Sequence, residues 1–408
     1  MIFTQGKTDC TPSDVAYNAD RLTVLNNHLQ SGIDAGEIQC AMYCLSRQGK
    51  VFAHAGIGKK SFRAEDNTPV QPDSVRWIAS VTKTFTAVAI MKLVEDGLAR
   101  LDQSVGEILP QFNTPPYNQI NIFNLLTHTS GLQADGGCFE NRYNVDYWAT
   151  IQRCYKLHDF EKDGEFDWIS AALNSNGGMR VSANKEWAYC SFGFTILGAI
   201  IEKLTGIHSH KYIEDMICKP LGMKDTVFPE NITSEMVKRH IISDIEDEKQ
   251  LNDQLNDIIN DVSENAGEKP TNPFDIYNIP HTGGGLLSTA QDMVRFGNMV
   301  LNRGSLDGVR ILGRKAVEKM TELSVQLPDY CWGAGGAIRK YAIGFDHRNG
   351  VQFTFSDVTV MHEGAGACAL YIDPQEELVA AWVVPLARDD WFPRIQYNTQ
   401  NIIWSGLE

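Results

Sequence analysis

The chain has 408 residues, 43% of them apolar and 21% charged, which is typical of a globular protein with one large core or two domains. Its formal net charge of -15 argues against a nucleic acid or an anionic membrane as the main partner, because both bind basic surfaces. No run approaches the ~18 apolar residues of a membrane span, and residues 1–10 do not resemble a signal peptide. We therefore expect a cytoplasmic protein whose nine scattered cysteines are mostly reduced.

The first predicted elements are a helix over residues 13–36 and a β-hairpin made of strands at 40–46 and 51–55. A long apolar helix is expected to begin at Ser80 and to end at Gly97, a residue that favours the left-handed conformation after a helix. From there to about residue 314 the signals are mostly helical. Two further apolar helices are predicted over 192–205 and 289–301.

Strand signals return near the C-terminus. Strands are predicted at 341–346, 354–361, 367–372 and 378–384, followed by a closing helix over 390–404.

Strands at both ends of the chain and helices in the middle predict an α/β (α+β) fold, with one antiparallel sheet shared by both ends and an inserted all-helical region. Residues 1–79 and 335–408 form the expected sheet region, and residues 80–334 form the mainly helical region. We expect the two to make one catalytic unit with the active site between them. The acidic segment 244–268 indicates a solvated helix or insertion.

Ser80 and Lys83 form the first chemical motif, because a serine and a lysine three residues apart lie on the same side of a helix. A hydroxyl near a helix N-terminus, with an amine one turn away, has a base in reach and backbone donors nearby for an oxyanion. The S-x-x-K pattern alone is weak, since it recurs from Ser182 to Lys185. An ordinary N-cap serine is the competing interpretation.

Three further motifs accompany Ser80 in order along the chain: Tyr189 ahead of an apolar helix, the H-T-G-G-G stretch from His281, and H-E-G-A from His362. With the L-T-H-T-S-G-L stretch at 126–132, they resemble the serine β-lactamase and penicillin-binding protein superfamily. The resemblance is greatest to its class C-like branch, which also holds family VIII carboxylesterases and D-aminopeptidases. It runs from about residue 20 to residue 390 and implies the β-lactamase/transpeptidase-like fold.

The resemblance assigns a catalytic role to three residues. Ser80 corresponds to the nucleophile and Lys83 to its base partner, whose pKa must be low enough for it to accept a proton. Tyr189 corresponds to the tyrosine that shares this proton and passes it to the leaving group. The oxyanion hole would consist of the backbone N–H groups of Ser80 and Ala365.

The same resemblance places four residues around the substrate. Ser191 stands where the family often has asparagine, and His362 stands where a lysine is common, followed by Gly364. Losing that lysine removes a positive charge that binds the carboxylate of a β-lactam, so these departures favour an esterase or peptidase. Glu363 is unusual beside such a site; it is a candidate for binding a cationic substrate group, although a strand-edge carboxylate in solvent is the more common case.

Other catalytic classes are less well supported. The chain lacks the G-x-S-x-G nucleophile motif of α/β-hydrolases. The stretch at 54–61 partly matches a phosphate-binding loop but lacks the first glycine of that motif. His208 and His210 lack a convincing third metal ligand in the sequence. We expect no metal and no organic cofactor.

We therefore expect a serine hydrolase that forms an acyl-Ser80 intermediate and hydrolyses a small ester or amide. A D-stereospecific aminopeptidase or DD-peptidase, a β-lactamase and an acyltransferase remain alternatives within the superfamily. A relative that binds a ligand without catalysis is the alternative of a different class, but such a protein has no need for Ser80, Lys83 and Tyr189 together. The expected partner is a small acyl substrate.

Overall fold

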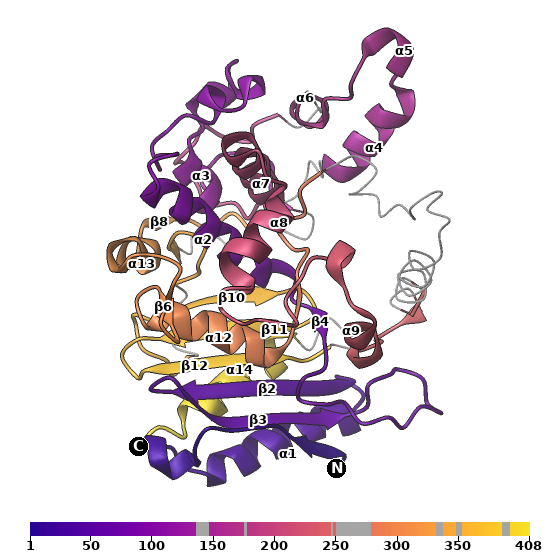
Figure 1. The fold of residues 1–408 in the computed structure, drawn as a ribbon, viewed down its shortest axis with the longest axis vertical. Helices are drawn as coiled ribbons and strands as arrows, with labels where there is room; N and C mark the ends of the chain where they lie inside the picture. Colours follow the sequence, from indigo (N-terminus) through magenta and orange to yellow (C-terminus); the bar gives the residue numbers. More distant parts are fainter. Residues whose placement is uncertain are drawn as a thin grey trace.

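The computed structural model describes residues 1–135, 147–174, 178–245, 248–249, 279–331, 338–347, 353–385 and 392–408. The chain forms an antiparallel sheet covered by helices on both faces, with a larger helical region next to it (Figure 1). Most of the acidic segment 244–268 lies outside the described residues.

Six strands make up the main sheet, and its central pairing joins strands from the two ends of the chain. Every neighbouring pair is antiparallel, which confirms the predicted fold class. The strands, in their spatial order, are β1 (Phe3–Gln5), β3 (Lys50–Gly58), β2 (Cys40–Arg47), β12 (Leu378–Val383), β11 (Cys368–Asp373) and β10 (Val360–Gly364).

Helices from distant parts of the chain cover the two faces of this sheet (Figure 1). On one face, α1 (Asp20–Asp34) and α14 (Phe392–Trp404) pack against each other. On the other face, α12 (Ala290–Leu301) packs against β2, β11 and β12. Gly297 permits this close approach, because a Cβ there would lie 2.4 Å from Cγ1 of Val379.

The helical region surrounds α2 (Thr82–Glu95), which is buried on nearly all of its sides, as an apolar helix without a polar face must be. Gly97 follows it with a φ of +74°, as predicted. The other helices are α3 (Ile122–Leu126), α4 (Tyr147–Leu157), α5 (Phe160–Asp163), α6 (Trp168–Leu173), α7 (Ser191–Thr205), α8 (Ser209–Ile213), α9 (Ser234–Arg239) and α13 (Arg314–Thr321).

Three short strand pairs complete the fold of the described residues. Two of them pair β4 (Arg76–Trp77) with β5 (Leu287–Ser288), and β6 (Ser305–Leu306) with β7 (Val309–Arg310). The third pairs β8 (Val325–Pro328) with β9 (Ile338–Tyr341). The first pair matters for function, because β4 leads directly to Ser80.

Two predicted strands are misplaced. The strand predicted at 341–346 ends at Tyr341, because the next residues form a turn in which Ala342 N–H donates to Phe345 O and Gly344 has a φ of +73°. The strand predicted at 354–361 begins only at Val360.

The cysteines of the described residues are mostly reduced, as predicted, with one exception. Seven of the described cysteines carry free thiols, three of them in the sheet, but Cys331 is disulfide-bonded and is therefore not reduced. Its partner lies outside the described residues. Within the ranges given above, none of the helices is both long enough and apolar enough to span a membrane.

Candidate active site

Ser80 lies in a short 3₁₀ turn, Ala79–Val81, immediately before α2, so the predicted helix begins two residues later than expected, at Thr82. The segment leading to it is held by two hydrogen bonds: Ile78 N–H donates to Leu286 O (3.0 Å), and the Cys368 thiol donates to Ile78 O (3.0 Å). Ala79 has a φ of +44°, a conformation that costs a non-glycine residue roughly 1–3 kcal/mol. The surrounding bonds therefore hold the backbone before Ser80 in a strained shape.

Lys83 is the second residue of α2 and is fully buried, and its amine has two hydrogen-bond partners. Nζ donates to Ser80 Oγ at 3.1 Å and to the backbone oxygen of Gly283 at 2.6 Å. Burial lowers the pKa of Lys83 to about 8, although the negative charge of Asp135 opposes this shift. Near neutral pH a useful fraction of this amine is therefore unprotonated and able to accept a proton from Ser80.

Tyr189 lies two residues before α7 and completes the cluster. Its side chain is hydrogen-bonded to Ser80, and its ring centroid lies 4.8 Å from Lys83 Nζ. Burial raises the pKa of Tyr189 above its ordinary value, so the phenol is neutral and can donate. The structure thus brings together the three residues that the sequence predicted as catalytic, with Ser80 between an amine and a phenol.

Asp135 is a site residue that the sequence analysis missed. Its carboxylate accepts from the Ser191 backbone N–H (2.7 Å) and from Ser191 Oγ (2.5 Å) at the start of α7. This charge raises the pKa values of both Lys83 and Tyr189. Asp135 and Ser191 are 56 residues apart in sequence, so no local pattern relates them.

The buried His128 ring packs against the Tyr189 ring. Its Nδ1 accepts from Cys190 N–H at 3.1 Å, so the remaining ring proton is on Nε2. Its ring centroid lies 4.5 Å from that of Tyr189. Burial and the neighbouring charge of Lys83 lower the pKa of His128, so the ring is neutral. We interpret His128 as a packing residue of the site.

The strand β10 places His362 and Glu363 on opposite faces of the sheet, since side chains alternate along a strand. The His362 ring faces the helical region, with its centroid 6.4 Å from that of Tyr189 and its Nε2 3.5 Å from the Tyr341 hydroxyl. The Glu363 carboxylate instead accepts from the Tyr371 hydroxyl at 2.7 Å. Tyr371 belongs to the core under α1 and α14, so Glu363 points away from Ser80.

Gly364 brings the end of β10 against the backbone that precedes Ser80. A Cβ at this position would lie 2.5 Å from Ile78 O and 3.2 Å from Ala79 Cβ, so only glycine allows the contact. Ala365 follows immediately in the turn to β11. The oxyanion-hole role of Ala365 and Ser80 stays a prediction.

One group of side chains in the described part of the chain has the composition of a metal site. His208, His210 and Glu230 each bring a donor atom within 4.8 Å of the others. Glu230 is the third donor that the sequence did not indicate, since 20 residues separate it from His210.

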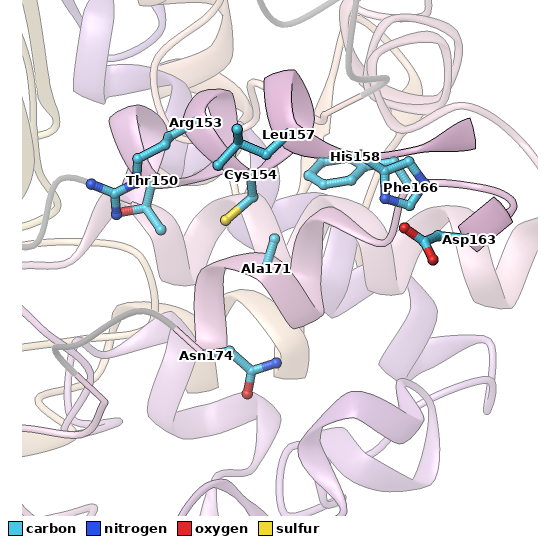
Figure 2. A pocket seen from close by; sticks show the side chains of 9 residues that line it. All are labelled: Thr150, Arg153, Cys154, Leu157, His158, Asp163, Phe166, Ala171 and Asn174. Carbon is cyan, nitrogen blue, oxygen red and sulfur yellow. The ribbon is translucent and has the colours of Figure 1, made fainter. Parts of the chain in front are cut away.

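An open pocket of about 440 Å³ lies between α4, α5 and α6 (Figure 2). Thr150 and Cys154 from α4 line it, together with His158, Asp163, Phe166 and Asn174. It shares no residue with the cluster around Ser80, so we assign it no part of the chemistry.

The comparisons with known proteins identify the family of the chain. The family model described as Beta-lactamase matches residues 25–394. Penicillin-binding protein 4 of Amycolatopsis lactamdurans is 26% identical over 74% of this chain and 72% of its own length. Esterase EstB of Burkholderia gladioli is 29% identical over 46% of each chain.

A solved penicillin-binding protein homologue from Caulobacter crescentus has the same fold. It superposes with a TM-score of 0.69 at 16% identity, covering 98% of this chain and all of the other. The family model spans nearly the whole chain and includes all three residues of the cluster. The chain therefore belongs to the Beta-lactamase family and is a serine hydrolase of that superfamily.

Proposed function

We propose that the protein hydrolyses small carboxylic esters through an acyl-Ser80 intermediate. The observation that carries this proposal is the buried Lys83 amine, 3.1 Å from Ser80 Oγ and with its pKa lowered to about 8. A lysine with an ordinary pKa would stay protonated and could not serve as a base near neutral pH.

The first half-reaction transfers the acyl group to the protein. Neutral Lys83 takes the Ser80 proton as Oγ attacks the ester carbonyl, which gives a tetrahedral oxyanion. Tyr189, hydrogen-bonded to Ser80, passes a proton to the leaving alkoxide and is reprotonated by Lys83. The alcohol departs and an acyl ester of Ser80 remains.

The second half-reaction returns the enzyme to its starting state. Water attacks the acyl carbonyl, and the Lys83–Tyr189 pair removes its proton. Ser80 leaves as an alkoxide that regains a proton from the same pair, and the carboxylic acid is released. The backbone N–H groups of Ser80 and Ala365 stabilise the oxyanion in both steps, a contribution that typically reaches 10²–10³-fold in rate per donor.

The charges near Ser80 favour an ester substrate over a β-lactam substrate. A β-lactam antibiotic carries a carboxylate, and the family position that often holds a lysine has His362 here. Asp135 adds a negative charge that acts on Lys83 and Tyr189, which further disfavours an anionic substrate. The likeness to Esterase EstB supports the same substrate class.

Ser80-dependent acylation tests the proposal. The protein is incubated with p-nitrophenyl acetate and butyrate, a penicillin and a D-alanyl amide, while intact-protein mass spectrometry and chromophore release are followed. We expect turnover of the nitrophenyl esters and an acyl adduct that Ser80→Ala abolishes. Ser182→Ala, which changes the exposed serine of the second S-x-x-K pattern, is the matched control and should behave as wild type.

Other results would change the assignment. Turnover of the D-alanyl amide alone would identify a peptidase, and turnover of the penicillin alone would identify a β-lactamase. Nitrophenyl ester hydrolysis that persists in Ser80→Ala would contradict the nucleophile.

A further inference from the structure

Both ring nitrogens of His210 take part in hydrogen bonds. These bonds indicate whether the group of His208, His210 and Glu230 is a metal site or a hydrogen-bonded cluster. The backbone N–H of His281 donates to His210 Nε2 at 2.9 Å. A nitrogen that accepts carries no proton, so the ring proton is on Nδ1, 2.8 Å from Glu230 Oε1. A metal bound at Nδ1 would displace that proton to Nε2 and break the bond from His281. The geometry therefore favours a hydrogen-bond relay over a metal centre.

The surroundings of His210 hold the ring in this orientation. Its side chain is only 5% exposed, and its ring stacks on Phe228 with centroids 3.8 Å apart and planes inclined by 5°. Burial raises the pKa of Glu230, but hydrogen bonding, above all the bond from His210, outweighs this effect and lowers the pKa overall. Glu230 is thus an ionised acceptor that fixes which His210 nitrogen carries the proton.

The turn that starts at His281 connects this pair to the catalytic amine. Gly285 N–H donates to His281 O at 2.9 Å, and a Cβ on Gly285 would lie 2.7 Å from that oxygen, so the turn is tight. Two residues after His281, the oxygen of Gly283 accepts from Lys83 Nζ at 2.6 Å. A shift of His281 therefore moves the carbonyl that orients Lys83.

We propose that His210 and Glu230 are positioning residues for acyl transfer: they fix the 281–285 turn, so that Gly283 holds the Lys83 amine toward Ser80. This inference rests on the proposed function. Neither residue touches the reacting atoms; the pair acts through the backbone of His281.

Three substitutions separate positioning from packing and from metal binding. His210→Phe keeps a ring to stack on Phe228 but removes the acceptor for His281 N–H. His210→Gln places an amide oxygen near the position of Nε2 and restores an acceptor. His208→Gln is the matched control, because His208 belongs to the same group but makes no contact with the turn among the bonds described here.

We expect His210→Phe to lower kcat for p-nitrophenyl butyrate by about 10–100-fold with little change in KM, the scale of a misplaced catalytic group. His210→Gln should recover most of this loss, and His208→Gln should match wild type. A merely structural role would give equal losses in the Phe and Gln variants.

The pH profile gives a second readout. A carbonyl acceptor favours the ammonium form of Lys83, so loosening Gly283 should lower the Lys83 pKa and move the acid limb of kcat/KM to lower pH in His210→Phe. An unmoved limb would count against the proposal. None of these substitutions changes the other titratable groups around Lys83, which are Asp135, Tyr189, Cys190, His128 and His281.

Hydrogen–deuterium exchange of the peptide over 279–288 tests the inference even without ester turnover. Faster exchange in His210→Phe, but not in His208→Gln, supports the relay whatever the substrate. Unchanged exchange together with unchanged kcat would overturn it. Loss of activity in both His208→Gln and His210→Phe, with added Zn²⁺ activating only the wild type, would replace it with a metal site.

Discussion

The buried amine of Lys83 is poorly solvated, which suits it to the proposed role of a base and makes it unfavourable for folding. Burial lowers its pKa to about 8, which means that the folded protein stabilises the ammonium less than water does. The two acceptors of its protons, Ser80 Oγ and Gly283 O, offset only part of that loss. Stability and catalysis therefore make opposite demands on this residue.

Lys83→Met tests that opposition, because methionine fills a similar volume without a charge. We expect acylation of Ser80 to slow by on the order of 10²-fold or more. The melting temperature should be unchanged or higher, since replacing a buried charge with an apolar group is often stabilising. Differential scanning calorimetry and single-turnover kinetics measure the two effects. A lower melting temperature together with lost activity would show that the amine stabilises the fold.

At the scale of one element, the hydrogen bonds at the N-terminus of α7 join this helix to the proposed catalytic residue Tyr189. Asp135 accepts two hydrogen bonds from Ser191, and a carboxylate at a helix N-terminus is favoured by the helix dipole. Tyr189 lies just ahead of the same helix, and its backbone oxygen accepts from Asp135 N–H at 2.9 Å. The residue that anchors α7 therefore also sets the charge near the reacting groups.

Asp135→Asn should move the acid limb of kcat/KM to lower pH. Asp135 raises the pKa of Lys83, so removing the charge lowers that pKa and makes the neutral amine available in more acidic solution. Asp135→Glu keeps the charge and should leave the limb near its wild-type position. A limb that moves to higher pH in Asp135→Asn would contradict the assigned sign.

Local patterns predicted the elements whose signals lie within a few residues of each other. The hairpin of β2 and β3, the glycine that follows α2 and the position of α12 within residues 289–301 all follow such short-range rules. The cluster of Ser80, Lys83 and Tyr189 could be predicted because its motifs follow the order found in a known family. Their spacing in the sequence alone does not indicate contact.

Long-range contacts account for what the sequence did not reveal. Gly283 lies 200 residues from Lys83, whose amine donates to its carbonyl oxygen, and Asp135 lies 56 residues from Ser191. Glu363 was a candidate for substrate binding, but the pleat of β10 directs it to Tyr371 on the other face of the sheet. The division of the chain into residues 1–79 with 335–408, and 80–334, stays a prediction.

At the scale of the whole molecule, the sheet and the helical region meet through α12. This helix packs on β2, β11 and β12, and its first turn contains the buried Asp292. Asp292 Oδ2 accepts from Asp225 N–H (2.9 Å) and from the Thr226 hydroxyl (3.0 Å). Burial raises the pKa of Asp292 to about 6.

This raised pKa predicts a pH-dependent stability. The pKa of Asp292 is about 3.9 in the unfolded chain and about 6 in the folded protein, so between these pH values the folded state binds more protons than the unfolded state. The contribution of Asp292 to the free energy of unfolding therefore decreases as the pH rises. Asp292→Asn removes this dependence and keeps one acceptor oxygen. We expect the free energy of unfolding of Asp292→Asn minus that of the wild type to increase from pH 4 to pH 6 and then to level off. Urea titrations at each pH measure it, and a constant difference would contradict the pKa assignment.

The most direct test of the central claim is the rate of Ser80 acylation as a function of pH, measured in single turnovers with p-nitrophenyl butyrate. If neutral Lys83 is the base, the rate rises with pH, levels off above about 8, and loses this limb in Lys83→Met. A rate that is independent of pH between 6 and 9, or a wild-type limb that survives in Lys83→Met, would contradict the assignment of Lys83 as the base that activates Ser80.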